Sequence, residues 1–168
     1  IFMMTDDMGF EDSHVYSDVI SQIKGHTNSR QIYTPNLDRL ARQGITFTDV
    51  HSPSTFCSTT RYALLTGRYS FRSIVQSRVW ALWKAPIIEE NRDTLGSMLQ
   101  AAGYRTAAIG KWHLGNRFAD INGKPVPDGD LAAWQTTTHF AETGDPDHPY
   151  VNNILDGPLH HGFDEYFG

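Results

Sequence analysis

Hydrophobic and polar positions along this chain form short blocks that predict strands and helices in turn. Residues 1–5 form an apolar run, which predicts a strand buried on both faces, as in a parallel sheet. Residues 45–50 alternate apolar and polar side chains and predict a second strand, while residues 104–109 predict a third that Gly110 ends. Strands separated by helical segments indicate an α/β fold, with a mostly parallel sheet sandwiched by helices.

Two segments carry helix signals at both of their ends. Residues 34–44 begin with Thr34 at the capping position and Pro35 at the first helical position, and they end in Gly44. Residues 94–103 show the same arrangement, from a threonine to a glycine. Both segments therefore predict short helices beside the sheet.

Two longer segments have few apolar positions and predict loops. Residues 10–33 mix Asp, Ser, Gly, His and Asn, and residues 116–161 are rich in Asp, Gly, Pro, Asn and His. Since the histidine spacing in the second segment does not repeat as in a zinc site, we interpret four of them as surface residues: His139, His148, His160 and His161.

Composition narrows the choice of function. The chain has 168 residues, 39% of them hydrophobic, and a net charge of −5, which is typical of a globular domain. It contains no basic run that would neutralise a nucleic acid backbone and no apolar run of the roughly 20 residues that cross a bilayer. We therefore expect neither nucleic acid nor a membrane as a partner. Its single cysteine cannot form an internal disulfide.

This cysteine, Cys57, stands where a short helix is predicted to begin. Thr59 or Thr60 would cap the helix, and Gly67 would end it. Free N–H groups at a helix N-terminus favour an anion, and Arg61, one turn further on, would direct its guanidinium to the same place. The stretch thus predicts a binding site for a tetrahedral oxyanion, with Cys57 as a nucleophile within the site. On the cysteine alone, a small buried hydrophobe remains the commoner alternative.

Two polar pairs follow predicted strands. Asp6 and Asp7 come directly after the first strand, and adjacent carboxylates repel each other unless a cation such as Ca²⁺ or Mg²⁺ intervenes. Lys111 and His113 come after the third strand and, in an extended chain, would project to the same side. Alone, each pair is more often a solvated turn or surface feature. Because ligands bind at the carboxyl ends of parallel strands, we expect both pairs to converge with Cys57 on one pocket.

The spacing around the cysteine resembles the signature of the sulfatase family, which is Cys-x-Pro-Ser-Arg, three residues, a hydrophobe and Thr-Gly-Arg. The matching positions here are Cys57, Arg61, Leu65, Thr66, Gly67 and Arg68. The Asp-Asp pair, residues 34–41, residues 110–115 and the closing Gly-Phe-Asp are also similar to landmarks of that family. Thr59 stands where the family has Pro or, less often, Ala, so we expect partial or absent modification of the cysteine in a heterologous host.

The resemblance implies an alkaline phosphatase-like α/β fold in which residues 1–168 are the N-terminal part of a single catalytic domain. It implies that a separate maturation enzyme oxidises Cys57 to formylglycine, whose hydrate attacks the sulfur of a sulfate ester. It also implies the roles of the other site residues: Asp6, Asp7 and the modified Cys57 as ligands of Ca²⁺ or Mg²⁺, Arg61 and Lys111 as groups that hold oxyanions, and His113 as a hydrogen-bond partner of the nucleophile.

Several further expectations follow from the resemblance. The substrate would be a sulfated small molecule or glycan, and the location periplasmic, secreted or lysosomal. Since the chain opens inside a predicted strand, without an initiator Met, we expect a fragment that is incomplete at both ends and inactive alone. A phosphate or phosphonate ester hydrolase of the same superfamily, or a non-catalytic relative that binds sulfated glycans, remains an alternative.

Overall fold

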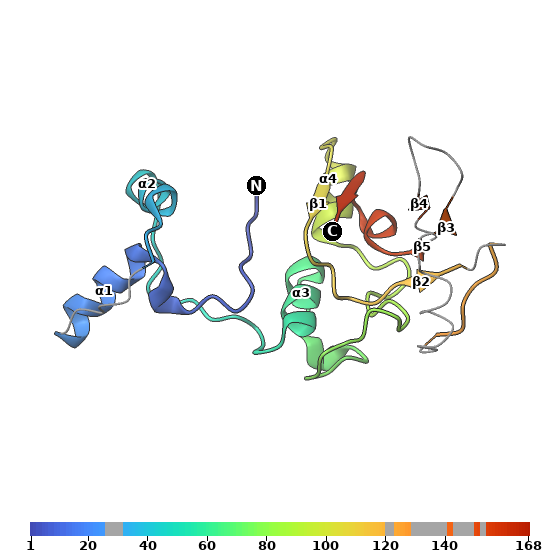
Figure 1. Cartoon of the computed structure of the whole chain (residues 1–168), viewed down its shortest axis with the longest axis horizontal. Helices are drawn as coiled ribbons and strands as arrows, with labels where there is room; N and C mark the ends of the chain where they lie inside the picture. Colours follow the sequence, from blue (N-terminus) through green and yellow to red (C-terminus); the bar gives the residue numbers. More distant parts are fainter. Residues whose placement is uncertain (26–31, 120–122, 129–140, 143–149, 152–153) are drawn as a thin grey trace. The chain divides into compact units, whose positions relative to one another are not determined.

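The computed structural model describes residues 1–25, 32–119, 123–128, 141–142, 150–151 and 154–168 (Figure 1). The chain divides into two compact units, residues 1–51 and residues 52–168, which are described separately below.

Helices make up the regular structure of the first unit among its described residues: η1 (Phe10–Asp12), α1 (His14–Lys24) and α2 (Pro35–Gln43). The two α-helices pack against each other. At their contact, the His14 N–H donates to Thr34 Oγ1 at 3.1 Å, and His14 Nδ1 lies 3.0 Å from Asp38 Oδ2. The predicted helix at residues 34–44 is confirmed, although the Thr34 hydroxyl binds α1 instead of capping α2.

The loop predicted for residues 10–33 is wrong, because residues 14–24 form α1. Val15, Val19 and Ile23 recur every four residues and place an apolar stripe along the helix. Gly25 then adopts the left-handed conformation, with φ 70°, and its N–H donates to Ser21 O at 2.9 Å, which ends the helix.

The strands predicted at residues 1–5 and 45–50 are also wrong in the structure. Neither segment pairs with a strand in the described part of the chain. A strand forms only where its N–H and C=O groups find a neighbouring strand, so both segments are irregular. Their large apolar side chains are exposed: Ile1, Phe2, Met3, Ile45, Phe47 and Val50.

The second unit combines helices with three strand pairs among its described residues. Its helices are α3 (Cys57–Thr66), η2 (Ser70–Arg72), α4 (Leu95–Ala101) and η3 (Pro158–His161). The strands β1 (Ala107–Ile109) and β6 (Glu165–Phe167) pair in parallel, with Ala108 opposite Tyr166, and Figure 1 shows them beside α4. Two antiparallel pairs join β2 (Arg117–Phe118) to β5 (Ile154–Asp156) and β3 (Ala141–Glu142) to β4 (Tyr150–Val151).

Three predictions for this unit are confirmed. A helix begins at the cysteine, a helix capped by Thr94 follows, and a strand ends before Gly110, although β1 is shorter than predicted. The closing Gly-Phe-Asp landmark anchors the parallel pair, since the Thr106 N–H donates to Asp164 Oδ2 at 2.7 Å.

Buried apolar side chains gather between α3 and the segment that follows β1. The buried members of this core are Tyr62, Val75, Ile87, Ile88, Trp112 and Leu114. Burying one such side chain stabilises a fold by about 1.5–3 kcal/mol. The segment that carries the predicted Lys-Trp-His motif is therefore part of the core.

The prediction of one loop over residues 116–161 is wrong, because their described residues contain β2, β3, β4, β5 and η3. Two described residues near the ends of this segment lie close together, since a Cβ added to Gly157 would lie 2.8 Å from Asn116 Oδ1. Asn116 is itself held by the bond from its N–H to Lys84 O at 3.0 Å. Asn116 and Gly157 therefore lie side by side.

The four histidines predicted at the surface have different outcomes. His139 and His148 lie outside the described residues, and His160 is exposed as predicted. For His161 the prediction is wrong, because this residue is only 7% exposed.

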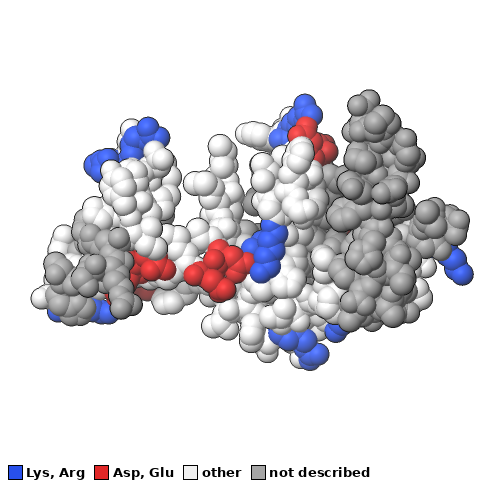
Figure 2. All heavy atoms as spheres, in the orientation of Figure 1, with Lys and Arg blue, Asp and Glu red and all other residues white. Residues whose placement is uncertain are grey.

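Charged side chains form small groups of each sign among the described residues on the face shown in Figure 2. In the same part of the chain, no helix is both long enough and apolar enough to cross a bilayer.

Candidate active site

Cys57 is the first residue of α3, and its side chain is half-buried. Phe56 occupies the capping position with extended backbone angles, φ −101° and ψ 144°. The prediction that Thr59 or Thr60 caps the helix is wrong, because the helix begins before both of them. Gly67 ends it in the left-handed conformation, with φ 66°, as predicted. The thiol therefore lies where the first N–H groups of a helix have no intrahelical acceptor.

Hydroxyl groups hold the start of α3. Thr59 is fully buried, and its Oγ1 donates to Phe56 O at 2.8 Å and contacts Ser54 Oγ at 2.5 Å. Thr60 Oγ1 donates to Ser54 O at 2.8 Å, and Ser58 Oγ accepts from the Trp80 N–H at 3.0 Å. Ser54 is not among the residues predicted from the sequence, where the serines that precede the cysteine are its signal. The network supplies a hydrogen-bonded constraint at the position where the family has Pro.

His113 meets the cysteine although 56 residues separate them. The Cys57 Sγ and His113 Nδ1 atoms are 3.2 Å apart. His113 has a φ of 58°, which is uncommon for a residue other than glycine. The expectation that Lys111 and His113 project from an extended chain is wrong, because the backbone turns at His113 and the intervening Trp112 is buried.

Arg61 also connects α3 to the segment after β1. Its Nη1 donates to the backbone oxygen of Lys111, and Lys111 itself is exposed. The structure thus brings together four of the predicted residues from two distant motifs: Cys57, Arg61, Lys111 and His113.

The segment that carries His113 is constrained from both sides. Leu114 is fully buried, and its carbonyl accepts from the Ile87 N–H at 3.0 Å. Gly115 has a φ of 77°, and a Cβ added there would lie 2.4 Å from Ala85 O. Only glycine fits this approach. An uncommon backbone conformation persists where the surrounding structure holds it in place. The packed residues Leu114 and Gly115 hold the left-handed backbone of His113 in this way.

A charged network lies on α3 behind the cysteine. Tyr62 Oη donates to Glu89 Oε2 at 3.1 Å, and Arg68 Nη1 lies 2.8 Å from Glu89 Oε1. Burial raises the pKa of Tyr62, and the charge of Glu89 raises it further. Burial also raises the pKa of Glu89, but the hydrogen bonds from its own N–H and from Tyr62, together with the charge of Arg92, outweigh burial and leave the pKa lowered. Arg68 of the signature thus joins a stabilising network through Glu89, which the sequence analysis missed.

Asp6 and Asp7 belong to the first unit and are both exposed, with φ 57° at Asp7. Their carboxylate oxygens fit the oxygen preference of Ca²⁺ and Mg²⁺. Within either unit, the described residues contain no group of three or more His, Cys, Asp or Glu side chains that could hold a metal ion. The convergence of the Asp pair with the cysteine stays a prediction.

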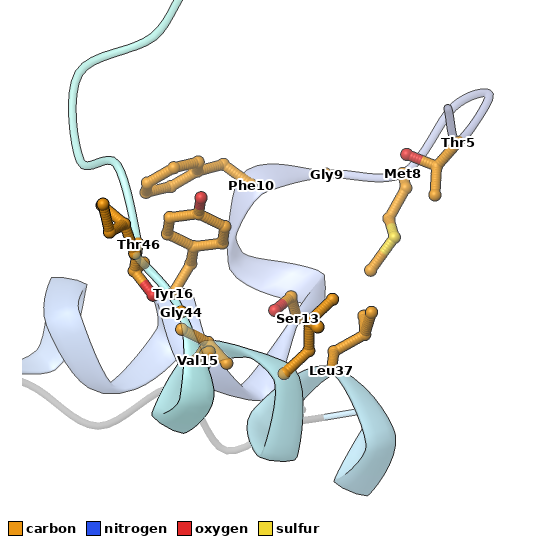
Figure 3. A pocket seen from close by; sticks show the side chains of 13 residues that line it. Thr5, Met8, Gly9, Phe10, Ser13, Val15, Tyr16, Leu37, Gly44 and Thr46 are labelled. Atoms are coloured by element: carbon orange, nitrogen blue, oxygen red, sulfur yellow. The ribbon is translucent and has the colours of Figure 1, made fainter. Parts of the chain in front are cut away.

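A separate pocket of about 570 Å³ lies within the first unit. Figure 3 shows Phe10 and Tyr16 on one side of it and Met8 and Leu37 on another. The Phe10 and Tyr16 rings lie 4.3 Å apart between centroids. The pocket is lined mainly by apolar side chains and includes none of the predicted site residues.

Comparisons with known proteins agree on one family. The family model described as Sulfatase matches residues 1–168. Human arylsulfatase G is 37% identical over 116 residues, and human arylsulfatase H is 31% identical over 175 residues. An N-acetylgalactosamine-6-O-sulfatase of Bacteroides thetaiotaomicron is 33% identical over 131 residues.

These alignments cover 69%, 100% and 76% of this chain, respectively. They cover 20%, 24% and 23% of the three relatives. The chain therefore spans about a fifth to a quarter of the length of the curated relatives it matches.

Solved structures show the same relationship. Ps i-CgsB in complex with k-i-k-neocarrahexaose matches with a TM-score of 0.59 and 25% identity, over 96% of this chain and 25% of that chain. A structure from work on the metabolism of multiple glycosaminoglycans by Bacteroides thetaiotaomicron matches with a TM-score of 0.55 and 28% identity, over 79% of this chain and 22% of that chain. These neighbours confirm the predicted fold class, the alkaline phosphatase-like α/β fold.

Proposed function

Because this chain belongs to the sulfatase family, we propose that the full-length protein hydrolyses a sulfate ester and that residues 1–168 form the N-terminal part of its single catalytic domain. One observation carries this proposal: the Cys57 Sγ and His113 Nδ1 atoms lie 3.2 Å apart at the N-terminus of α3. This contact joins the two motifs of the chain that resemble the catalytic landmarks of sulfatases.

Cys57 is the residue that a maturation enzyme would convert to formylglycine. The modified side chain would supply the nucleophile, and Asp6, Asp7 and that side chain would hold a Ca²⁺ or Mg²⁺ ion, which would supply positive charge. The Asp oxygens and their exposure fit such an ion. We predict Ca²⁺, with Mg²⁺ as the alternative.

The other site residues act on protons and oxyanions. His113 Nδ1 lies beside the side chain of Cys57, where it can hold or move the proton of the nucleophile. Lys111 offers a positive charge to the sulfate oxygens, whose charge grows as the ester bond breaks. Arg61 adds a second positive charge and, through its bond to Lys111 O, keeps this segment against α3.

The relatives favour a sulfated glycan over a sulfated small molecule as the substrate. One relative is an N-acetylgalactosamine-6-O-sulfatase, and one structural neighbour was solved with a neocarrahexaose. We extend this preference for saccharides to the full-length protein as part of the proposal.

The test uses the full-length protein produced together with a formylglycine-generating enzyme. We expect release of sulfate from aryl sulfates and sulfated oligosaccharides, and a mass loss at the Cys57 peptide that marks formylglycine. Cys57→Ala should abolish turnover, and Ser77→Ala, at an exposed position, should not change it. Faster release of phosphate than of sulfate would favour a phosphate or phosphonate ester hydrolase. An unmodified cysteine with retained binding of sulfated sugar would favour a non-catalytic relative.

A further inference from the structure

A buried histidine lies behind the segment that carries His113. His161, the last residue of η3, is 7% exposed, and its Nε2 lies 3.0 Å from Asp156 Oδ1. The other oxygen of this carboxylate, Oδ2, lies 4.0 Å from Arg117 Nη1. The proposed function gives none of these residues a role.

The His161 ring packs on Trp112, the residue between Lys111 and His113. The two rings are nearly parallel, at 20°, with centroids 6.0 Å apart. Phe163 meets Trp112 edge-on at 6.3 Å, and the indole N–H donates to Gly115 O at 3.1 Å. The tryptophan is therefore held by contacts from η3, from the residues after η3 and from its own segment.

The fold fixes the place of the histidine through backbone contacts. The register of β2 and β5 sets Arg117 opposite Asp156, which places the carboxylate beside η3. The Thr94 hydroxyl donates to His161 O at 2.7 Å and ties the end of η3 to the start of α4. The imidazole thus has a defined position from which to hold the indole.

We propose that His161 is a positioning residue that, through Trp112, keeps His113 within reach of residue 57. It contacts neither the cysteine nor its partner imidazole by any described bond, so its effect is indirect. The left-handed backbone at His113 needs such support, because it is uncommon outside glycine. This inference rests on the proposed function for the identity of the groups that are positioned.

The protonation state of His161 suits this role. Burial lowers the pKa of its imidazole, the charge of Asp156 opposes that effect, and His160 lowers the pKa further. The balance leaves the pKa below its usual value of 6.5, so the ring is mainly neutral at neutral pH. A neutral ring can stay buried against the indole without the cost of desolvating a charge.

The first test measures turnover in the full-length protein that carries formylglycine. Since a displacement of about 1 Å near a reacting group costs about 100-fold in rate, His161→Ala should lower kcat about 100-fold. We expect KM to change less than about threefold, because the residue does not touch substrate. His161→Phe keeps a ring on Trp112 and should recover at least about a third of kcat. Leu159→Ala, at an exposed position of the same η3 helix, is the matched control and should leave kcat unchanged.

The second test needs no turnover and separates this inference from the proposed function. Hydrogen–deuterium exchange of residues 111–115, measured in the full-length protein with unmodified Cys57, should become about tenfold faster in His161→Ala and stay near wild type in His161→Phe. Unchanged exchange in His161→Ala, or a fall in kcat that only follows the folded fraction, would overturn the inference. If wild type hydrolyses no sulfate ester, the proposed function fails while the exchange still decides the positioning role.

A further variant covers failure of His161→Ala to fold. Asp156→Ala removes the carboxylate that lies 3.0 Å from the imidazole Nε2, so the ring loses its neighbour on that side and residues 111–115 should exchange faster than in wild type. Wild-type exchange in Asp156→Ala, together with wild-type kcat, would count against the inference as decisively as the His161→Ala result.

Discussion

The two units of this chain differ in how their candidate site residues are held. Buried neighbours surround those of the second unit, and the Asp pair of the first unit is exposed. In residues 52–168, His113 stands between the buried residues Trp112 and Leu114 and makes its contact to Cys57 from there. In residues 1–51, the Asp pair follows an exposed apolar segment, and the described apolar side chains that are fully buried all belong to the other unit. A core therefore supports one half of the predicted chemistry.

This difference shows for which residues a side-chain contact can be used to infer chemistry. A side chain whose neighbours are packed has one position, and a contact such as the one between Cys57 and His113 can be interpreted chemically. For exposed carboxylates, the chemistry of the donor atoms carries the argument, as it does for Asp6 and Asp7. Matched substitutions in the two units can test this difference.

The largest effect should come from the histidine of the second unit. His113→Ala in the full-length protein should lower kcat/KM by about 10²–10⁴-fold, because general acid–base groups contribute that much to rate. The matched change His14→Ala removes an imidazole that lies 3.0 Å from a carboxylate in the first unit and should cost less than about threefold. Steady-state kinetics on an aryl sulfate compares them, and equal losses would break the contrast between the units.

Much of the second unit could be predicted from its sequence, because its elements are marked by local signals. Gly67 and Thr94 stand at helix ends, and both act there as predicted. The meeting of Cys57 and His113 could be anticipated because each follows a strand or begins a helix. These predictions depended on short-range patterns that a single sequence displays.

The remainder depended on partners that no local pattern reveals. Residues 1–5 have the composition of a strand, yet strand formation needs a neighbour, and none pairs with them in the described part of the chain. Glu89 and Asp156 look like ordinary surface carboxylates in sequence, and only tertiary contacts connect them to Arg68 and His161. Helix α1 was missed for another reason: its four-residue apolar spacing was outweighed by polar composition.

A second comparison concerns stability. Leu114→Ala removes a fully buried side chain and should lower the free energy of unfolding by about 2–5 kcal/mol. Leu40 in α2 is 58% exposed, so Leu40→Ala should change the free energy of unfolding by about 0.5 kcal/mol or less. Urea denaturation of the full-length variants measures both values. A large loss for Leu40→Ala would mean that the first unit has a buried core of its own.

Two glycines with similar backbone angles sharpen the same contrast. Gly115→Ala combines a left-handed φ of 77° with a Cβ 2.4 Å from Ala85 O, and should cost about 3 kcal/mol in the free energy of unfolding. Gly25→Ala meets the same conformational cost, at φ 70°, but has no heavy atom within 4 Å of the added Cβ, so about 1 kcal/mol is expected. Thermal unfolding of the two variants would reveal whether packing or backbone conformation dominates.

The smallest expected effect is a dependence of stability on pH in the second unit. The pKa of Glu89 is lowered on folding, so the unfolded chain binds its proton first as pH falls. Its contribution is present above the unfolded value of 4.5 and is lost as pH falls through the lower folded value. Because this side chain is 41% exposed, screening should keep the effect below about 1 kcal/mol.

Glu89→Gln should remove that part of the acid sensitivity and leave the slope near neutral pH unchanged. The free energy of unfolding, measured at intervals between about pH 3 and pH 6, gives the comparison. A wild-type slope in the variant would show that Arg68, Arg92 and Tyr62 do not stabilise the charged carboxylate.

The close approach of Asn116 and Gly157 has a consequence for how this protein can vary. A loop whose two ends are clamped to the same spot transmits little of its own length to the rest of the molecule, and lengthening it adds only a slowly growing entropy cost. The residues enclosed by the β2–β5 pair can thus be shortened, extended or exchanged while Arg117 and Asp156 keep their places beside η3. Insertions that arise by mutation, or that are made in the laboratory, should therefore be tolerated in that segment.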